Sequence, residues 1–315
     1  MTRTFALLLL VAAMGAGAFA AEPPVIRSLA EASGAGPTPP ADSGAQEALE
    51  RYNGGTAALQ RRELESAVSQ FRQAVRLDPT LADAHHNLGV ALLELRQPVP
   101  AITALQRALE LAPDRVESRL GLGMALRDAG EPSRAIAELT QIVPSRPDDP
   151  QLRLMLADLY GKTRQPRAAA EQLRQAARLL PSDAALRFQL GLVALEAGEL
   201  DWAIEAFRGA TRLNPADADA HYNLGVAAGE KIRALVDEKV ATYRRAVELR
   251  PDLADAHYHL GIAYIQKAQL GRVEEKRVLL RLALEEFRLF QRYAPNDPKA
   301  AAATHNIRVL EPQVK

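Results

Sequence analysis

The chain contains no cysteine among its 315 residues. Disulfide bonds are therefore excluded, and so is a lipid-modified cysteine at a cleavage site. No asparagine stands in an N-x-Ser/Thr sequon, so the chain offers no acceptor for N-glycosylation. A secreted eukaryotic domain of this size usually carries disulfides or sequons. For an exported chain, the absence of both favours the bacterial periplasm.

The chain also lacks a surplus of either charge, with 39 basic and 39 acidic side chains and a formal net charge of zero. Proteins that bind nucleic acid or anionic membranes through a global field need a basic surplus. We therefore predict no nucleic-acid partner for this chain.

Motifs for catalysis and metal binding are missing as well. Gly121-x-Gly123 has neither the third glycine nor the preceding strand of a dinucleotide site, and no G-x-S-x-G, P-loop or Cys–His arrangement occurs. His257 and His259 are two residues apart, which on a helix turns them to different faces, and no Glu-x-x-His pair completes a zinc site. We predict no catalytic residues, no metal and no cofactor, and interpret the chain as a non-enzyme.

The N-terminus has the form of a secretory signal. One positive charge at Arg3 precedes an apolar run, FALLLLVAA, and the small-x-small site Ala18-Phe19-Ala20. We predict a cleavable signal peptide over residues 1–20, with an uncleaved anchor as the alternative. After cleavage no segment is expected to remain inserted in a membrane. Residues 21–45 are rich in Pro, Ala and Gly, which predicts a disordered leader.

Prolines mark a repeat over the rest of the chain. Five of them are spaced 34 residues apart, and two more follow at 36 and 44: Pro79, Pro113, Pro147, Pro181, Pro215, Pro251 and Pro295. A fixed period in this range indicates a solenoid. Within residues 46–297 the seven repeats run over 48–81, 82–115, 116–149, 150–183, 184–217, 218–253 and 254–297.

Each repeat pairs one small residue with one large one. Counted from the start of each repeat, position 8 holds Gly55, Gly89, Gly123, Ala157, Gly191, Gly225 and Gly261. Position 24 holds Phe71, Leu105, Leu139, Leu173, Phe207, Tyr243 and Phe287. The small residue permits a close approach of two helices, and the large one fills the space between them. The proline then ends the second helix, because it lacks the backbone donor.

In the second repeat Leu88-Gly89, Ala101, Leu105, Ala108 and Pro113 occupy the characteristic places of the tetratricopeptide repeat (TPR). The sequence resembles a TPR protein. The resemblance implies an all-α, right-handed superhelical solenoid of about seven helix hairpins. A C-terminal capping helix over 299–310 and a tail over 311–315 should follow. Histidines at position 4, where the family often has a large packing residue, are interpreted as structural: His85, His221 and His257.

Three repeats depart from this pattern. The first has Gly54 beside Gly55, which predicts the least stable first helix. The sixth has two extra residues, and Lys239 stands where the small Ala belongs. The seventh has ten extra residues and no turn glycine before Gly271, so its second helix, 272–293, should be about two turns longer than the others.

The resemblance places positions 5, 6 and 9 of the first helices on the inner surface of the array. Aromatic residues at position 5, amides or imidazole at position 6 and aliphatic residues at position 9 suit an extended peptide. The alternative is that positions 5 and 9 pack against the next repeat. The predicted peptide-binding residues are Asn87, Phe188, Gln189, Leu192, Tyr222, Asn223, Val226, Tyr258, His259 and Ile262.

From these observations we predict a non-catalytic protein–protein interaction scaffold or adaptor of the bacterial cell envelope, which binds extended peptide segments of partner proteins. Two alternatives stay open. One is an oligomeric structural scaffold that assembles through the elongated helices of repeats six and seven. The other is a non-catalytic subunit of an envelope enzyme complex. The residues themselves leave the partner, the pathway and the oligomeric state open.

Overall fold

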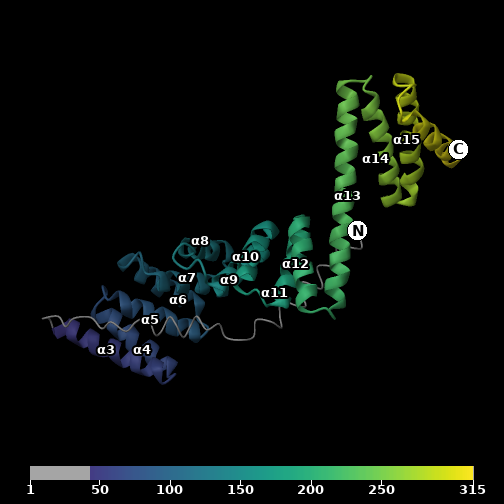
Figure 1. Cartoon of the computed structure of the whole chain (residues 1–315). Helices are drawn as coiled ribbons and strands as arrows, with labels where there is room; N and C mark the ends of the chain where they lie inside the picture. Colours follow the sequence, from purple (N-terminus) through teal and green to yellow (C-terminus); the bar gives the residue numbers. More distant parts are fainter. Residues whose placement is uncertain (1–42, 315) are drawn as a thin grey trace. The chain divides into compact units, whose positions relative to one another are not determined.

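A computed structural model describes residues 43–314, and every regular element in that range is an α-helix (Figure 1). The all-α fold that the repeats predict is confirmed, whereas the predicted signal peptide and residues 21–42 of the leader lie outside the described residues. The helices are α3 (Ser43–Gln60), α4 (Leu64–Leu77), α5 (Ala82–Glu94), α6 (Pro98–Leu111), α7 (Val116–Asp128), α8 (Pro132–Ile142), α9 (Pro150–Lys162), α10 (Pro166–Leu179), α11 (Ala184–Glu196), α12 (Leu200–Leu213), α13 (Ala218–Leu249), α14 (Ala254–Leu270), α15 (Val273–Tyr293) and α16 (Ala300–Val314).

The chain divides into two compact units between Leu186 and Arg187. Helices α3 to α10 belong to the first unit. The second unit contains most of α11 and all of α12 to α16. Helix α3 begins at Ser43, so the last residues of the predicted leader are helical.

A left-handed residue makes the bend in each of the first five hairpins. These residues recur every 34 positions with φ between 57° and 78°: Arg62, Arg96, Gly130, Arg164 and Gly198. The bend is closed by backbone bonds of the Schellman type, such as the Gln97 N–H to the Leu92 carbonyl at 2.9 Å. Three of the second helices then start with a proline, whose fixed φ suits the first helical turn: α6, α8 and α10.

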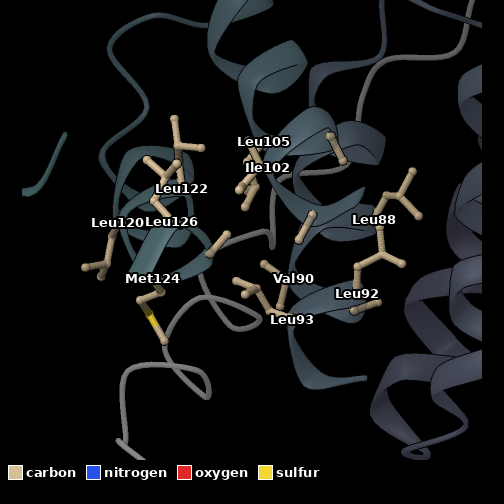
Figure 2. Packing of buried hydrophobic residues seen from close by; sticks show 14 of the residues in the cluster. Leu88, Val90, Leu92, Leu93, Ile102, Leu105, Leu120, Leu122, Met124 and Leu126 are labelled. Carbon is tan, nitrogen blue, oxygen red and sulfur yellow. The ribbon is translucent and has the colours of Figure 1, made fainter. Parts of the chain in front are cut away.

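A glycine sets the distance between the two helices of a hairpin. A β-carbon built on Gly89 would lie 2.4 Å from the side chain of Leu105, and one on Gly55 would lie 2.7 Å from the Phe71 ring. Both large side chains are completely buried. Figure 2 shows Leu105 and Ile102 of α6 between the side chains of α5 and those of α7. The pairing of small with large residues predicted at positions 8 and 24 is therefore the centre of each hairpin.

The sixth repeat forms one helix of 32 residues, α13, where the sequence predicts a hairpin. The residue in register with the left-handed bend residues is Ile232, 34 positions after Gly198. A β-branched side chain strongly disfavours that backbone conformation. No glycine or proline occurs from residue 230 to residue 249, so nothing stops the helix. Repeat six therefore contributes one long helix, and the other six repeats form hairpins.

The last repeat has the predicted long second helix. Helix α14 ends at Leu270, directly before Gly271, and α15 has 21 residues where α12 has 14. Helix α16 packs on this hairpin through Ala303 and Leu310, which join the buried cluster around Phe287 and Phe290. It runs beyond the predicted capping segment, since residues 311–314 are also helical. None of the described helices is both long and apolar enough to span a membrane.

The double glycine of the first repeat allows a matched pair of substitutions. Gly55→Ala places a β-carbon 2.7 Å from the ring of Phe71, and such overpacking costs about 1–3 kcal/mol. Gly54→Ala meets only the side chain of Gln70 at 3.4 Å, and should stabilise the helix by up to about 1 kcal/mol. Amide hydrogen exchange in α3 should accelerate in the first variant and slow in the second. Equal exchange rates would contradict this assignment.

Candidate peptide-binding surface

In the first unit, buried polar side chains of successive first helices are bonded to each other. Asn87 Nδ2 donates to the hydroxyl oxygen of Tyr52 at 3.2 Å. His86 Nδ1 and Ser118 Oγ lie 3.0 Å apart, and this hydrogen bond connects the second repeat to the third. All four side chains are buried, and Asn87 has only 1% of its surface exposed. This predicted site residue therefore lies inside an inter-repeat polar network.

The second unit holds the other nine predicted site residues. On α11, Phe188 and Leu192 are buried, and the Phe188 ring meets the edge of Phe207 with ring centroids 5.7 Å apart. Gln189, between them, is exposed. Only the amide of this group is therefore well placed to meet a ligand.

On the N-terminal half of α13 the exposure is reversed. Tyr222 has 71% of its surface exposed. Asn223 is buried, and its Nδ2 donates to the Asp219 carbonyl of the preceding turn at 2.9 Å. Val226 is half-buried. Here the aromatic residue faces solvent and the amide is already bonded.

On α14, Tyr258 belongs to a cluster of rings within the seventh repeat. Its centroid is 5.2 Å from that of Phe290 and 5.7 Å from that of Phe287. His259 is exposed on one side and stacks on Tyr243 of α13 at 5.5 Å. Ile262 is half-buried against the same core.

An ion pair lies beside this ring cluster. Lys299 pairs with Asp255, and its Nζ is 5.8 Å from the centroid of the Tyr258 ring. The hydrogen bond to Lys299 lowers the pKa of the Asp255 carboxyl, and the same bond raises the pKa of Lys299. The position-2 aspartate of this repeat is thereby kept ionised and paired with a positive charge.

The predicted aromatic row (Phe188, Tyr222 and Tyr258) is interrupted in the structure. Phe188 and Tyr258 pack within the chain, and Tyr222 alone of the three is turned to solvent. The cause is α13, because α14 packs on its C-terminal half, where Val240 joins the core of the seventh repeat. Tyr222 lies on the other half. For Phe188 and Tyr258 the structure therefore favours packing within the chain.

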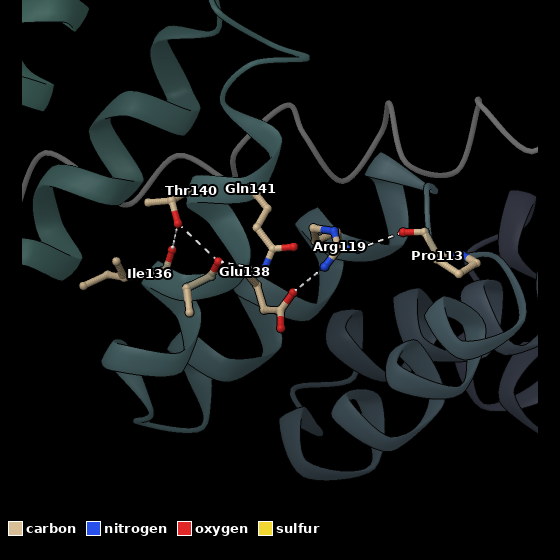
Figure 3. Close-up of polar contacts among 7 residues, drawn as sticks. Pro113, Arg119, Ile136, Glu138, Thr140 and Gln141 are labelled. Carbon is tan, nitrogen blue, oxygen red and sulfur yellow. Dashed lines mark hydrogen bonds and ion pairs between the residues drawn. The ribbon is translucent and has the colours of Figure 1, made fainter.

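The residue at position 4 has a structural contact that the sequence analysis did not identify. Its side chain bonds the carbonyl of the proline six residues earlier, in the pairs His85–Pro79, Arg119–Pro113, Arg153–Pro147, His221–Pro215 and His257–Pro251. Several of these side chains also reach position 23 of the second helix; Arg119 bonds Glu138 at 2.9 Å (Figure 3), and His257 bonds Glu286 at 2.6 Å. In the sequence, the only sign of this contact is that position 4 always follows the proline by six residues.

These contacts account for the position-4 histidines as part of the fold. Within residues 43–314 no group of three or more His, Cys, Asp or Glu side chains is arranged to hold a metal ion.

Comparison with protein families follows the same repeats. Tetratricopeptide-repeat models match residues 92–159, 154–217 and 189–230, and a TPR-repeat model matches residues 55–95 and 237–267. Together they cover most of the described residues. The chain is a tetratricopeptide-repeat protein. In this TPR protein the family models stop matching at residue 230 and match again from residue 237. Both residues lie within α13.

Solved TPR structures resemble the chain over about half its length. A crystal structure of MamA has a TM-score of 0.49 at 18% identity, covering 55% of this chain and 95% of that one. YrrB, described as a TPR protein with an unusual peptide-binding site, has a TM-score of 0.49 at 19% identity, covering 56% and 90%. A MamA fragment from Desulfovibrio magneticus RS-1 has a TM-score of 0.47 at 21% identity, covering 55% and 97%. No curated protein matches the chain.

The burial of Tyr52 predicts a specific pH dependence. Burial, followed by the charge of Asp83, raises the pKa of Tyr52 above 10.0. A raised pKa means that the folded state holds the phenol proton more tightly, so this contribution to stability is present below pH 10 and is lost as the pH rises through the folded pKa. Ultraviolet titration of wild type minus Tyr52→Phe should show a tyrosine that ionises above pH 10. A difference curve centred at or below pH 10 would contradict the burial of Tyr52.

Proposed function

We propose that this TPR protein is a non-catalytic scaffold that holds extended segments of partner proteins along the inner faces of its first helices. Tyr222 carries the proposal, because 71% of its surface is exposed. The residues at position 5 of the other repeats are buried or half-buried. A large ring turned to solvent on a solenoid's binding face is well suited to anchor a partner side chain.

The surrounding side chains divide into those available to a peptide and those that shape the wall. Gln189 and His259 are exposed and supply polar groups for a peptide backbone. Val226 and Ile262 are half-buried and supply apolar edges, whereas Leu192 is buried and shapes the wall. The amides of Asn87 and Asn223 are buried and already bonded, Asn87 to Tyr52 of the preceding repeat and Asn223 to the Asp219 carbonyl of its own helix.

Two further roles are compatible with such a scaffold. As a subunit of an enzyme complex, the protein would position a catalytic partner without supplying catalytic residues itself. As an oligomeric scaffold, it would assemble through its atypical end. The continuous helix α13 favours the second role, since it leaves apolar side chains exposed in the middle of the second unit.

We place this scaffold in the bacterial cell envelope. The support comes from the signal-like N-terminus, with its apolar run and small-x-small site, and from the absence of cysteine and sequons in the sequence. A periplasmic scaffold would meet the partners that cross or line the envelope.

The peptide-binding proposal predicts opposite effects for two tyrosines. Tyr222→Ala should weaken the binding of a peptide selected against the wild-type chain by tens of fold, as expected when an aromatic anchor worth about 2 kcal/mol or more is removed. Its melting temperature should stay close to that of wild type. Tyr258→Ala should lower the melting temperature, because that ring packs on Phe287 and Phe290.

Affinity is measured by calorimetric titration with the selected peptide. Val273→Ala is the matched control, since Val273 is 87% exposed and lies at the start of α15, outside the first helices. Its affinity should equal that of wild type. If Tyr222→Ala has a much lower melting temperature than wild type and binds the peptide normally, the ring contributes to packing within the chain and the proposed anchor is wrong.

The localisation proposal predicts the mature N-terminus. Mass spectrometry of the chain produced in a bacterial host should find an N-terminus at Ala21 or Glu22 in the periplasmic fraction. Leu8→Arg interrupts the apolar run and should leave a longer precursor in the cytoplasm. A wild-type chain that remains full-length in the cytoplasm would refute export.

A further inference from the structure

Helix α13 joins two halves of one TPR repeat that do not touch each other. Family matches end at residue 230 on one side and resume at residue 237 on the other. Each half is packed on its outer neighbour. The N-terminal half lies against α12, and Lys231 pairs with Asp201. The C-terminal half lies against α14, and Arg244 bonds the Tyr264 hydroxyl at 2.9 Å.

Each half exposes the face that would meet the other half in a hairpin. The N-terminal stripe consists of three exposed residues at helical spacing: Gly225, Gly229 and Ile232. The C-terminal stripe likewise consists of Leu235, Lys239, Thr242 and Leu249. Ile232 is 53%, Leu235 48% and Leu249 68% exposed.

The two halves match each other at the centre of the TPR packing pattern. In the other glycine-containing repeats the position-8 glycine faces a buried large side chain on the second helix, as Gly89 faces Leu105. In repeat six the corresponding pair is Gly225 and Tyr243, but nothing lies within 4 Å of a β-carbon on Gly225. The straight helix holds this pair about 27 Å apart, at 1.5 Å per residue.

One turn nearer the bend, repeat six has a large residue on its C-terminal half opposite a glycine on its N-terminal half; repeat four also has a glycine at this place, Gly161, but opposite Ala169. In four hairpins a large apolar residue at position 12 is in register with a fully buried alanine: Leu59 with Ala67, Leu93 with Ala101, Leu195 with Ala203, and Ile265 with Ala283. In repeat six the sizes are reversed, and Gly229 is in register with Lys239. The missing side chain on one half leaves room for the lysine stem on the other.

Closure within one chain is opposed by the local sequence. A hairpin would need a bend near residues 232–235, where Ile232, Arg233, Ala234 and Leu235 include neither glycine nor proline. The other bends have a left-handed residue or, at Gly271, a glycine at the end of the first helix. Two separate copies can bring the same faces together without bending either helix.

We propose that a second copy of this chain covers these stripes, with two α13 helices packed antiparallel about a two-fold axis near residue 234. The N-terminal stripe of each copy then meets the C-terminal stripe of the other, and both sixth repeats are completed by exchange. Such exchange of identical elements is a low-cost route to a symmetric dimer, because it reuses contacts that the fold already encodes. The charged flanks Lys231 and Asp237 keep their own-chain partners, Asp201 and Lys267. The pairing does not depend on peptide binding, and its test contains no peptide.

Light scattering on the purified full chain tests the mass. Wild type should have twice the mass of one chain, and Gly225→Leu should have the mass of one chain with undiminished helical circular dichroism. The added side chain has open space in the single chain but collides with Tyr243 of the second copy. Gly161→Leu is the control: it too has nothing within 4 Å, lies in α9, and should leave the dimer intact.

A single cysteine tests the register, since the chain has none of its own. In the proposed dimer the two copies of residue 235 are offset by only about 3 Å along helices whose axes lie about 8–10 Å apart. Leu235→Cys should therefore form a covalent dimer on mild oxidation. Leu249→Cys is more exposed to oxidant than Leu235→Cys, but its two copies are about 45 Å apart along the helices, and it should stay monomeric on a denaturing gel.

A wild-type chain with the mass of one copy at every concentration would overturn the proposal. A dimer that survives Gly225→Leu, or that cross-links through Leu249→Cys and not through Leu235→Cys, would overturn it equally, because the pairing would then use another surface.

Discussion

The distance between two helices is the constraint on which this fold depends, and a missing side chain sets it. Where Gly89 or Gly191 approaches the second helix, a β-carbon would lie 2.4–2.5 Å from Leu105 or Phe207. The large residue then fills the hairpin and reaches the next repeat, as Leu105 does at Gly121, where a β-carbon would lie 3.2 Å from it. One side chain thus sets both the width of a repeat and its contact with its neighbour.

Polar contacts fix the orientation that this packing leaves free. The position-4 side chain bonds the proline carbonyl at the end of the preceding repeat, and in the third and seventh repeats it also bonds a carboxylate on its own second helix. A carbonyl at a helix end would otherwise lack an intrahelical partner. Histidine and arginine serve equally here because each presents two N–H or nitrogen sites. This explains why histidines recur at one position without forming a metal site.

Helix α13 shows how a small local change reorganises a repeat array. Six repeats bend because a glycine or a left-handed residue stands at the bend, and Ile232 takes that place in the sixth. The packing residues Gly225 and Tyr243 are retained, although they no longer meet in one chain. A repeat that keeps its packing residues but has no bend can be completed by a second copy of the chain. The proposed dimer would then present two binding faces.

Outside repeat six, the sequence by itself determined the helices, the period and the small–large pairs, because each depends on residues within 34 positions of one another. It also identified the long second helix of repeat seven, since Gly271 is the first residue there that can end α14. Only the tertiary structure decided which predicted site residues are accessible. Tyr222 and Tyr258 occupy the same position in their repeats, yet one faces solvent and the other packs among rings. Tyr258 packs on Phe287 and Phe290 of its own second helix, whereas α13 continues straight through Ile232 and brings no second helix back to Tyr222. The difference therefore depends on the bend, which is missing at Ile232, 10 residues after Tyr222, and present at Gly271, 13 residues after Tyr258.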